Sequence, residues 1–275
     1  MKKFFILILF VFTLPCVAQL KTPALSPSST LKQTIGLTDV EVQYSRPSVK
    51  DREIFSKNGL LPYGQIWRTG ANSATKITFS DSVTVANKKF AKGSYTFLAI
   101  PAATTWELQW YPYNSKDWTT YQEQTPLATI TVPVTSIPFT ETFEIRCTDI
   151  TMESGNLTLA WERSQVQIPM KMNTISKTLK AIDGVMTGPS LNDYFQAAVF
   201  LHENNTDLTR ALSYIQKVTP ERRLFFVVTR EAQILKDLNK NKEALAVART
   251  ALSLSKKAEN NDFIKINQDI INALK

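Results

Sequence analysis

Cysteine and histidine are almost absent from this chain of 275 residues, which contains two cysteines and one histidine. His202 precedes Glu203 near the expected end of a helix, where an exposed side chain that interacts with the helix dipole is the usual arrangement. No spacing typical of a zinc site occurs. A Ser-His-Asp triad would have to bring His202 onto a different part of the chain. The sequence therefore predicts no metal site, no cofactor and no catalytic histidine or cysteine.

Long hydrophobic runs are also missing, and the one apolar run at the N-terminus is short. Lys2 and Lys3 precede an apolar stretch from Phe4 to Leu14, which the segment Pro15–Gln19 follows. A membrane-spanning helix needs about 20 apolar residues, whereas a charged start, a short apolar stretch and a small-residue exit are typical of a secretory signal peptide. We expect residues 1–18 to be removed after Ala18. The mature chain would then have no integral membrane segment, and the protein would be exported, with a periplasmic location.

Removal of the signal peptide would take Cys16 with it and leave Cys147 as the single cysteine. One thiol cannot form an intramolecular disulfide, so the fold must depend on an ordinary hydrophobic core. Phe143, Ile145 and Cys147 alternate with polar residues in the sequence. This alternation predicts a thiol on the buried face of a strand rather than a nucleophile.

The chain has a formal net charge of +8, but no long run of Lys or Arg concentrates it. Nucleic acid is therefore not an expected partner, since a nucleic-acid arm or patch gathers its positive charge locally. A dispersed basic field favours anionic ligands or envelope surfaces in a general way.

Apolar residues recur at every second position between about residue 32 and residue 170. Short alternating runs that are separated by turn residues are typical of an antiparallel β-sandwich or barrel. We assign residues 19–170 to an antiparallel, jelly-roll-like β-sandwich. The clearest runs are Val40, Val42 and Tyr44; Trp106, Leu108 and Trp110; and Leu157, Leu159 and Trp161.

The period changes to that of α-helices after Met170, so the fold class is α+β in two parts. Ser190 and Asp193 have the spacing of a capping box, which predicts a helix that begins after Ser190. Thr219 followed by Pro220 predicts the start of a later helix. We assign residues 171–275 to this α-helical region.

The helical region contains a partial repeat. Ala211 and Ala244 lie 33 residues apart within similar sequences, and this period resembles tetratricopeptide-type (TPR-like) helical hairpins. Hairpins of this kind bind a protein partner or pack against a neighbouring domain. Two repeats are too few for a long groove, which favours packing.

The segment Tyr44–Ser80 is the most distinctive polar stretch, because it combines arginines, glycines and aromatic residues without simple alternation. The planar guanidinium group of arginine suits bidentate binding of carboxylate or phosphate, and an amide and a hydroxyl add neutral donors. The predicted ligand-binding residues are Arg46, Arg52, Trp67, Arg68, Asn72 and Thr75. The alternative is structural: the arginines pair with Asp51, Glu53 or backbone carbonyls and fix an irregular loop.

A second cluster of aromatic residues follows further along the chain. Rings on a β-sandwich can stack on sugars, or they can pack across strands and anchor loops. Packing explains Trp106 and Trp110 of the alternating run better than Trp118 and Tyr121, which lie outside the alternation. The cluster consists of Trp106, Trp110, Tyr111, Tyr113, Trp118 and Tyr121.

Three long motifs in this sequence resemble the DUF2911 family of exported proteins, which is seen mainly in Bacteroidota. They are YSRPSVKDREIF at Tyr44–Phe55, YGQIWRTGANSATKITF at Tyr63–Phe79 and GSYTFLAIP at Gly93–Pro101. The resemblance extends from about Leu25 to the end of the chain and includes the trailing helical hairpins. The resemblance implies that the protein is exported. It implies no activity, because the family has no established function.

Together these observations favour a non-catalytic protein that binds an anionic or carbohydrate-like envelope ligand through the arginine-rich surface. One alternative is an envelope hydrolase that acts on a glycan or ester and uses Asp51 or Glu53 as acid or base. Another is an interaction scaffold in which the C-terminal helices bind a protein partner.

Overall fold

The computed structural model describes residues 22–186 and 188–275, which form two compact units. The β unit contains Asp39–Asp149, Gly155–Met170 and the described residues up to Thr34. The helical unit contains Lys171–Lys275 together with two turns, Ile35–Thr38 and Ile150–Ser154. The predicted signal peptide, residues 1–18, lies outside the described residues.

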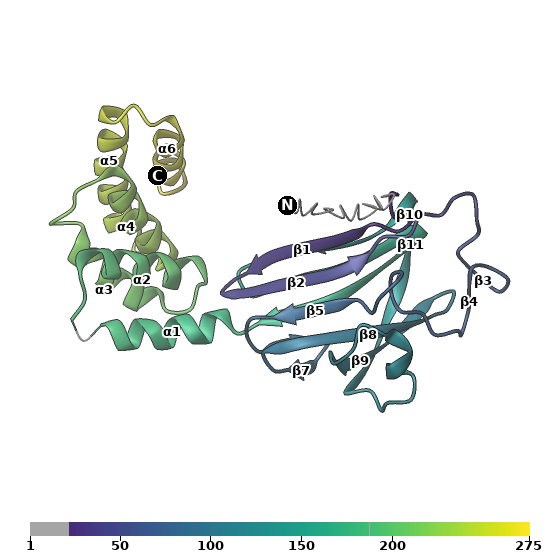
Figure 1. The fold of residues 1–275 in the computed structure, drawn as a ribbon. Helices are drawn as coiled ribbons and strands as arrows, with labels where there is room; N and C mark the ends of the chain where they lie inside the picture. The colour runs from purple at the N-terminus through teal and green to yellow at the C-terminus, as the bar shows by residue number, and fades with distance from the viewer. Residues whose placement is uncertain (1–21, 187) are drawn as a thin grey trace, which may run out of the picture. The chain divides into compact units, whose positions relative to one another are not determined.

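The β unit is built on one large antiparallel sheet with the strand order β1-β2-β5-β8-β9-β10-β11-β6-β7 (Figure 1). A short parallel pair, β3 and β4, lies on the excursion between β2 and β5. The strands are β1 (Ser28–Ile35), β2 (Thr38–Ser45), β3 (Phe55–Ser56), β4 (Leu61–Pro62), β5 (Lys76–Phe79), β6 (Val83–Val85), β7 (Lys88–Phe90), β8 (Gly93–Pro101), β9 (Thr105–Pro112), β10 (Ala128–Thr148) and β11 (Ser154–Met172).

Strand β10 divides the sheet into two layers. Its first part, through Pro133, pairs with β9, and its remainder from Val134 pairs with β11. Phe90 on β7 lies 5.0 Å from Trp110 on β9 between ring centroids, although three strands separate β7 from β9 in the sheet. The sheet therefore folds over on itself like a sandwich, and the predicted antiparallel β part is confirmed.

The core between the layers consists of the residues that alternate in the sequence. Val40 and Val42 of β2, Leu108 of β9 and Leu157 and Leu159 of β11 are fully buried. Period-two alternation places every second side chain on one face of a strand, so the pattern that predicted the strands also supplies the core.

The helical unit contains α1 to α6, which confirms the predicted helical part. Helix α2 packs on α3, α4 packs on α5, and α5 packs on α6. Ala211 and Ala244 are both fully buried in this unit, while its TPR-like character stays a prediction. The helices are α1 (Thr174–Val185), α2 (Leu191–Glu203), α3 (Leu208–Val218), α4 (Phe225–Asp237), α5 (Asn241–Lys257) and α6 (Asn261–Ala273).

Of the two helix starts predicted from capping residues, one is confirmed and the other is wrong. Ser190 and Asp193 form the predicted capping box at the start of α2. Thr219 does not begin a helix: it follows the last residue of α3 with αR dihedrals, and α4 begins only at Phe225. The Thr219 hydroxyl donates a hydrogen bond back to the Ile215 carbonyl at 3.0 Å, as a residue at the end of a helix can do.

Candidate ligand-binding site

The excursion between β2 and β5 is attached to both layers of the sheet by short stretches of strand-like pairing. Ser48 forms an isolated bridge with Thr142 of β10, and Trp67 forms one with Ala99 of β8. At the second bridge the Trp67 amide donates to the Ala99 carbonyl at 2.7 Å, and the reverse bond is 2.8 Å. These bonds fix the backbone on which the arginines lie.

Trp67 is the interior anchor of the excursion. Its side chain is buried, and its ring lies 5.7 Å from Trp106 and 5.8 Å from Trp161 between centroids. The indole Nε1 donates to the Gly70 carbonyl at 3.0 Å. Trp67 is therefore part of the sandwich core, and its bond to Gly70 also stabilises the turn that follows it.

Several residues of the excursion have a left-handed backbone although they are not glycine. The φ angles are 49° at Lys50, 56° at Asp51, 54° at Thr69 and 59° at Asn72. A positive φ is most unusual for a β-branched residue such as Thr69. Strained backbone of this kind persists only where its surroundings hold it, and it is concentrated at functional sites.

Thr75 belongs to the interior of this loop. It is fully buried, and its hydroxyl donates to the Thr69 carbonyl at 2.6 Å. Gly70 lies beside it with φ of +149°, and a Cβ at Gly70 would stand 3.1 Å from the Thr75 Oγ1. Thr75 therefore stabilises the turn that presents Arg68 and Asn72.

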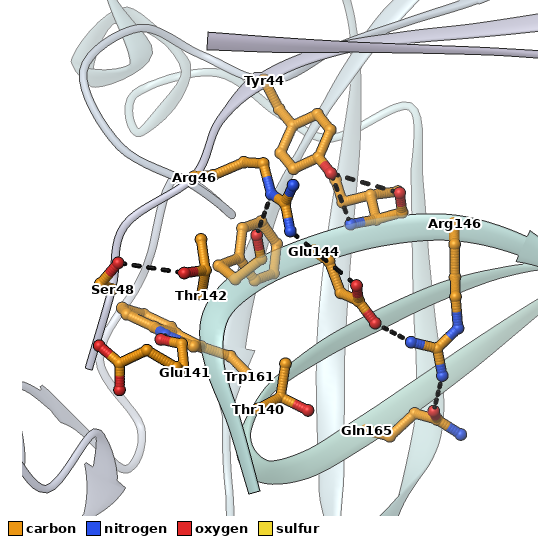
Figure 2. Close-up of polar contacts among 12 residues, drawn as sticks. Tyr44, Arg46, Ser48, Thr140, Glu141, Thr142, Glu144, Arg146, Trp161 and Gln165 are labelled. Carbon is orange, nitrogen blue, oxygen red and sulfur yellow. Dashed lines mark hydrogen bonds and ion pairs between the residues drawn. The ribbon is translucent and has the colours of Figure 1, made fainter. Parts of the chain in front are cut away.

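Arg46 is bound on the side of β10. Its Nε donates to the Phe143 carbonyl at 2.9 Å, and its Nη2 lies 3.9 Å from the Glu144 carboxylate. Figure 2 shows that Glu144 also pairs with Arg146, so one carboxylate serves two guanidinium groups. Arg46 thus joins the excursion to the sheet and does not line the pocket described next.

An open pocket of about 480 Å³ lies on the excursion, and we call it the cationic pocket. Lys50, Arg52 and Arg68 contribute positive charge, and no Asp or Glu is among the described residues that line it. The described residues that line it are Leu25, Ser26, Pro47, Ser48, Lys50, Arg52, Leu60, Leu61, Trp67, Arg68, Gly70, Ala71, Asn72 and Trp161. Four of the six predicted residues, Arg52, Trp67, Arg68 and Asn72, are brought together here.

Backbone carbonyls orient the two arginines of the pocket without neutralising them. Arg52 donates from Nε to the Val49 carbonyl at 2.8 Å and from Nη2 to the Ser48 carbonyl at 2.7 Å. Arg68 donates from Nη1 to the Asn72 carbonyl at 3.0 Å and stacks over Trp118. A guanidinium has five N–H donors, so most donors of Arg68 and the Nη1 of Arg52 have no hydrogen-bond partner in the described part of the chain.

The expected ion pairs between these arginines and Asp51 or Glu53 do not form among the described residues. Both carboxylates belong to exposed residues and neither lines the cationic pocket. The positive φ at Asp51 redirects the chain in a tight turn, in which the Arg52 amide donates to the Val49 carbonyl at 3.2 Å. Of the structural alternative, the ion pairs are therefore wrong, whereas the bonds from the arginines to backbone carbonyls do form.

The aromatic cluster of the sequence separates into core and loop residues. Trp106 and Trp110 are buried in the sandwich, whereas Tyr121 is buried in a small separate cluster against Tyr111. The Tyr121 hydroxyl accepts from the Ser115 amide at 2.7 Å, which fixes the loop. Trp118 packs against this cluster and supports the Arg68 guanidinium, so packing accounts for most of these rings.

Lys50, Leu25, Leu60 and Trp161 line the pocket but were not among the predicted site residues. Lys50 stands two positions before Arg52, and its charge was the available signal in the sequence. Trp161 comes from β11 and Leu25 precedes β1. Nothing in the sequence indicates that segments so distant along the chain meet at one pocket.

Other reactive groups have ordinary structural surroundings. Burial raises the pKa of the Cys147 thiol to about 11, which keeps it protonated and unreactive at neutral pH. His202 accepts a hydrogen bond from Arg230 at Nδ1 and lies 2.9 Å from Asp237 through Nε2. Its side chain is only 10% exposed, so the expected surface position is wrong, whereas its place in the last turn of α2 agrees with the expected position at a helix end.

Residues 22–186 and 188–275 contain neither a cluster of metal ligands nor a helix that could span a membrane. No group of three His, Cys, Asp or Glu side chains is arranged to bind a metal ion. No helix in these ranges combines the length and apolar character that a bilayer span requires.

Comparison with known proteins gives one match. The model of the family described as "Protein of unknown function (DUF2911)" matches residues 26–170. This range contains the whole excursion with the cationic pocket apart from Leu25. No curated protein and no solved structure matches the chain. The match extends over more than half of the chain, and the protein therefore belongs to the DUF2911 family.

Proposed function

We propose that this protein binds an anionic ligand in the cationic pocket and does not transform it chemically. The observation that supports this most directly is the charge of the lining, which contains Lys50, Arg52 and Arg68 and no carboxylate among its described residues. A basic concave surface concentrates negatively charged ligands. Phosphate, carboxylate and acidic sugars all present the acceptor oxygens that a guanidinium binds.

The orientation of the arginines supports the same proposal. Carbonyl acceptors hold Arg52 and Arg68 in place without cancelling their charge. A ligand anion would meet guanidinium groups that have already lost much of their side-chain freedom. Preorganisation of this kind improves affinity because less entropy is lost on binding. Asn72, whose Nδ2 donates to the Ser45 Oγ and the Ser26 carbonyl, stabilises the rim beside Arg68.

The hydrolase alternative receives less support. It needs Asp51 or Glu53 as the acid or base, and a candidate base has to lie within reach of the bound substrate. Both residues are exposed and lie outside the pocket lining. We therefore place no catalytic residue in the cationic pocket.

The scaffold alternative has one observation in its favour. A groove of about 300 Å³ between α1 and α2 is lined mainly by apolar side chains, among them Ile182, Ala197 and Phe200. A stable protein interface buries about 800 Å² on each partner, far more than this groove offers. The anion-binding proposal is preferred because the cationic pocket combines charge, oriented donors and a rigid base.

The proposed setting is the periplasm, on the basis of the N-terminal signal peptide. In that compartment anionic glycans and phosphorylated envelope compounds are available as ligands. This location is tested by fractionating cells that express the full chain and by sequencing the N-terminus of the mature protein. Export is expected to leave Gln19 as the first residue.

The binding proposal is tested with the double variant Arg52→Gln/Arg68→Gln. Calorimetric titration with glucose 1-phosphate, glucuronate and neutral glucose should show binding of the two anions only. The variant should lose at least tenfold in affinity, because each charge-assisted hydrogen bond contributes about 1.5–3 kcal/mol. The variant also loses the bonds from Arg52 and Arg68 to backbone carbonyls, so its free energy of unfolding should fall by about 1–2 kcal/mol and it should remain folded.

The matched control is Arg163→Gln/Lys89→Gln, which removes the same charge from exposed residues of the β unit outside the pocket. This control separates a local site from the general basic field of the protein. Unchanged affinity in the folded Arg52→Gln/Arg68→Gln variant, or an equal loss in the control, would overturn the proposal.

A further inference from the structure

The lining of the cationic pocket contains exposed apolar residues as well as charged ones. Leu25 and Leu60 line it with side chains that are 80% and 47% exposed, and Leu61 lines it as a partly buried residue. Single exposed leucines are common on protein surfaces. Here two of them line the same pocket as three cationic side chains. A purely polar ligand would leave the apolar surface of these leucines in water.

The base of the pocket is apolar for a different reason. Trp67 and Trp161 are stacked 5.8 Å apart with an interplanar angle of 25°. The Trp67 Nε1 donates to the Gly70 carbonyl at 3.0 Å, and the Trp161 Nε1 donates to the Glu141 carbonyl at 3.3 Å. Both indole donors are engaged and the two residues are only 4% and 1% exposed, so the apolar surface that a ligand can cover comes mainly from the leucines.

From these contacts we infer that the ligand is an amphiphile, with an anionic headgroup joined to a single apolar chain. This inference rests on the proposed anion-binding function. The headgroup lies against Lys50, Arg52 and Arg68, and the chain covers Leu25 and Leu60. The charged and the apolar residues of the lining then each meet a matching part of one molecule.

The energetics favour such a ligand over a small anion. An exposed anion site gains little, because both partners are well hydrated and salt screens their attraction. Removing apolar surface from water adds a term that salt does not screen, about 0.8 kcal/mol for each buried methylene group. That term corresponds to about a fourfold gain in affinity for each methylene group that the leucines cover.

The experiment measures affinity as a function of chain length. The full chain is titrated with inorganic phosphate and with butyl, hexyl and octyl phosphate below their micelle concentrations. We expect octyl phosphate to bind at least tenfold more tightly than butyl phosphate. Octyl glucoside, which has the same chain and no charge, should bind at least tenfold more weakly than octyl phosphate.

Two variants locate the apolar part of the interaction. Leu25→Ser/Leu60→Ser should remove most of the dependence on chain length and leave the affinity for inorganic phosphate within about twofold. The control Leu127→Ser changes another exposed leucine of the β unit, 56% exposed and outside the pocket, and should behave like the natural sequence.

The outcomes separate the two proposals. An affinity that does not depend on chain length but is lost in Arg52→Gln/Arg68→Gln would overturn the amphiphile and leave anion binding intact. Equal binding of octyl glucoside and octyl phosphate, or no binding of any phosphate, would overturn both. A chain-length dependence that survives in Leu25→Ser/Leu60→Ser would place the chain elsewhere and overturn the inference. Sedimentation with phosphatidylglycerol vesicles that depends on the two leucines would replace capture of a single amphiphile by attachment to a membrane surface.

Discussion

Arg46 and Arg52 lie close together on one excursion of the chain, and their guanidinium groups have different surroundings. Arg46 donates to the carbonyl of Phe143 and approaches Glu144, so it is bound into the β unit. Arg52 donates only to the carbonyls of Val49 and Ser48 and lines the cationic pocket. The same residue type therefore attaches the loop in one place and offers charge to solvent in the other.

The comparison extends to the rest of the excursion. Trp67, Gly70 and Thr75 form an inner part with tertiary contacts in the core, whereas Lys50 and Arg68 belong to a rim. Substitutions in the inner part should affect folding, and substitutions at the rim should affect binding. A sequence motif that contains both parts cannot be treated as one functional unit.

The largest effect is expected for Trp67→Ala. The ring contacts Phe55, Trp106, Phe143 and Trp161 in the core. Truncation of a buried aromatic side chain costs about 3–5 kcal/mol, because it removes apolar burial and leaves a cavity. Urea unfolding monitored by circular dichroism measures this loss.

Trp67→Phe sharpens the same measurement. It keeps a ring in the core and removes the Nε1 donor to Gly70, so we expect a cost of about 1–2 kcal/mol. Equal stability of Trp67→Ala and the natural sequence would contradict the assignment of Trp67 to the inner part.

A smaller effect is expected for Arg46→Met. Methionine keeps much of the apolar stem, but the Phe143 carbonyl loses its donor from Arg46, at a cost of about 1–2 kcal/mol. Glu144 keeps its partner Arg146. The free energy of unfolding should fall, and the affinity of the cationic pocket for glucose 1-phosphate should stay within about twofold.

Arg52→Gln is the matched rim variant for this comparison. It also loses two bonds to backbone carbonyls, so a similar small loss of stability is expected, but here the affinity for glucose 1-phosphate should fall as well. A loss of affinity in Arg46→Met as large as that in Arg52→Gln would break the distinction between inner part and rim.

Most of the fold could be predicted from periodicity. Residues such as Val40 and Leu108 alternate with polar neighbours, and alternation of this kind directly reports a strand with one buried face. The capping box of Ser190 and Asp193 was equally direct, since both residues act within one helical turn. The helix start predicted at Thr219 was wrong, because a threonine before proline is compatible with the end of one helix as well as with the start of the next.

The candidate site could be predicted only as a segment. Whether Arg46 or Arg52 faces the pocket depends on the left-handed turn at Lys50 and Asp51 and on a bridge to Thr142. The bridge is a tertiary contact, and two consecutive positive φ angles at non-glycine residues have no clear sequence signal. Trp161 reaches the pocket from β11 and Leu25 from the segment before β1, so their place depends on tertiary structure that no local sequence pattern reports.

The smallest effect concerns Cys147 on β10, which reports whether a variant has loosened the sheet. Its buried thiol has a pKa of about 11. At pH 8 its thiolate fraction is therefore about a hundredfold below that of an exposed thiol, and only the thiolate reacts with a disulfide reagent. In the folded natural sequence the thiol should react at least tenfold more slowly than in urea.

The same pKa fixes the sign of the pH dependence. Because burial favours the neutral thiol, its contribution to stability is present below the ordinary cysteine pKa of 9.0 and is lost as the pH rises through about 11. Labelling at pH 8 should become modestly faster in Arg46→Met, which loses its bond to β10 beside Glu144, and should not change in Arg52→Gln. Equal acceleration in both variants would mean that the rim arginine also holds the sheet together, and the division of the excursion into inner part and rim would then be wrong.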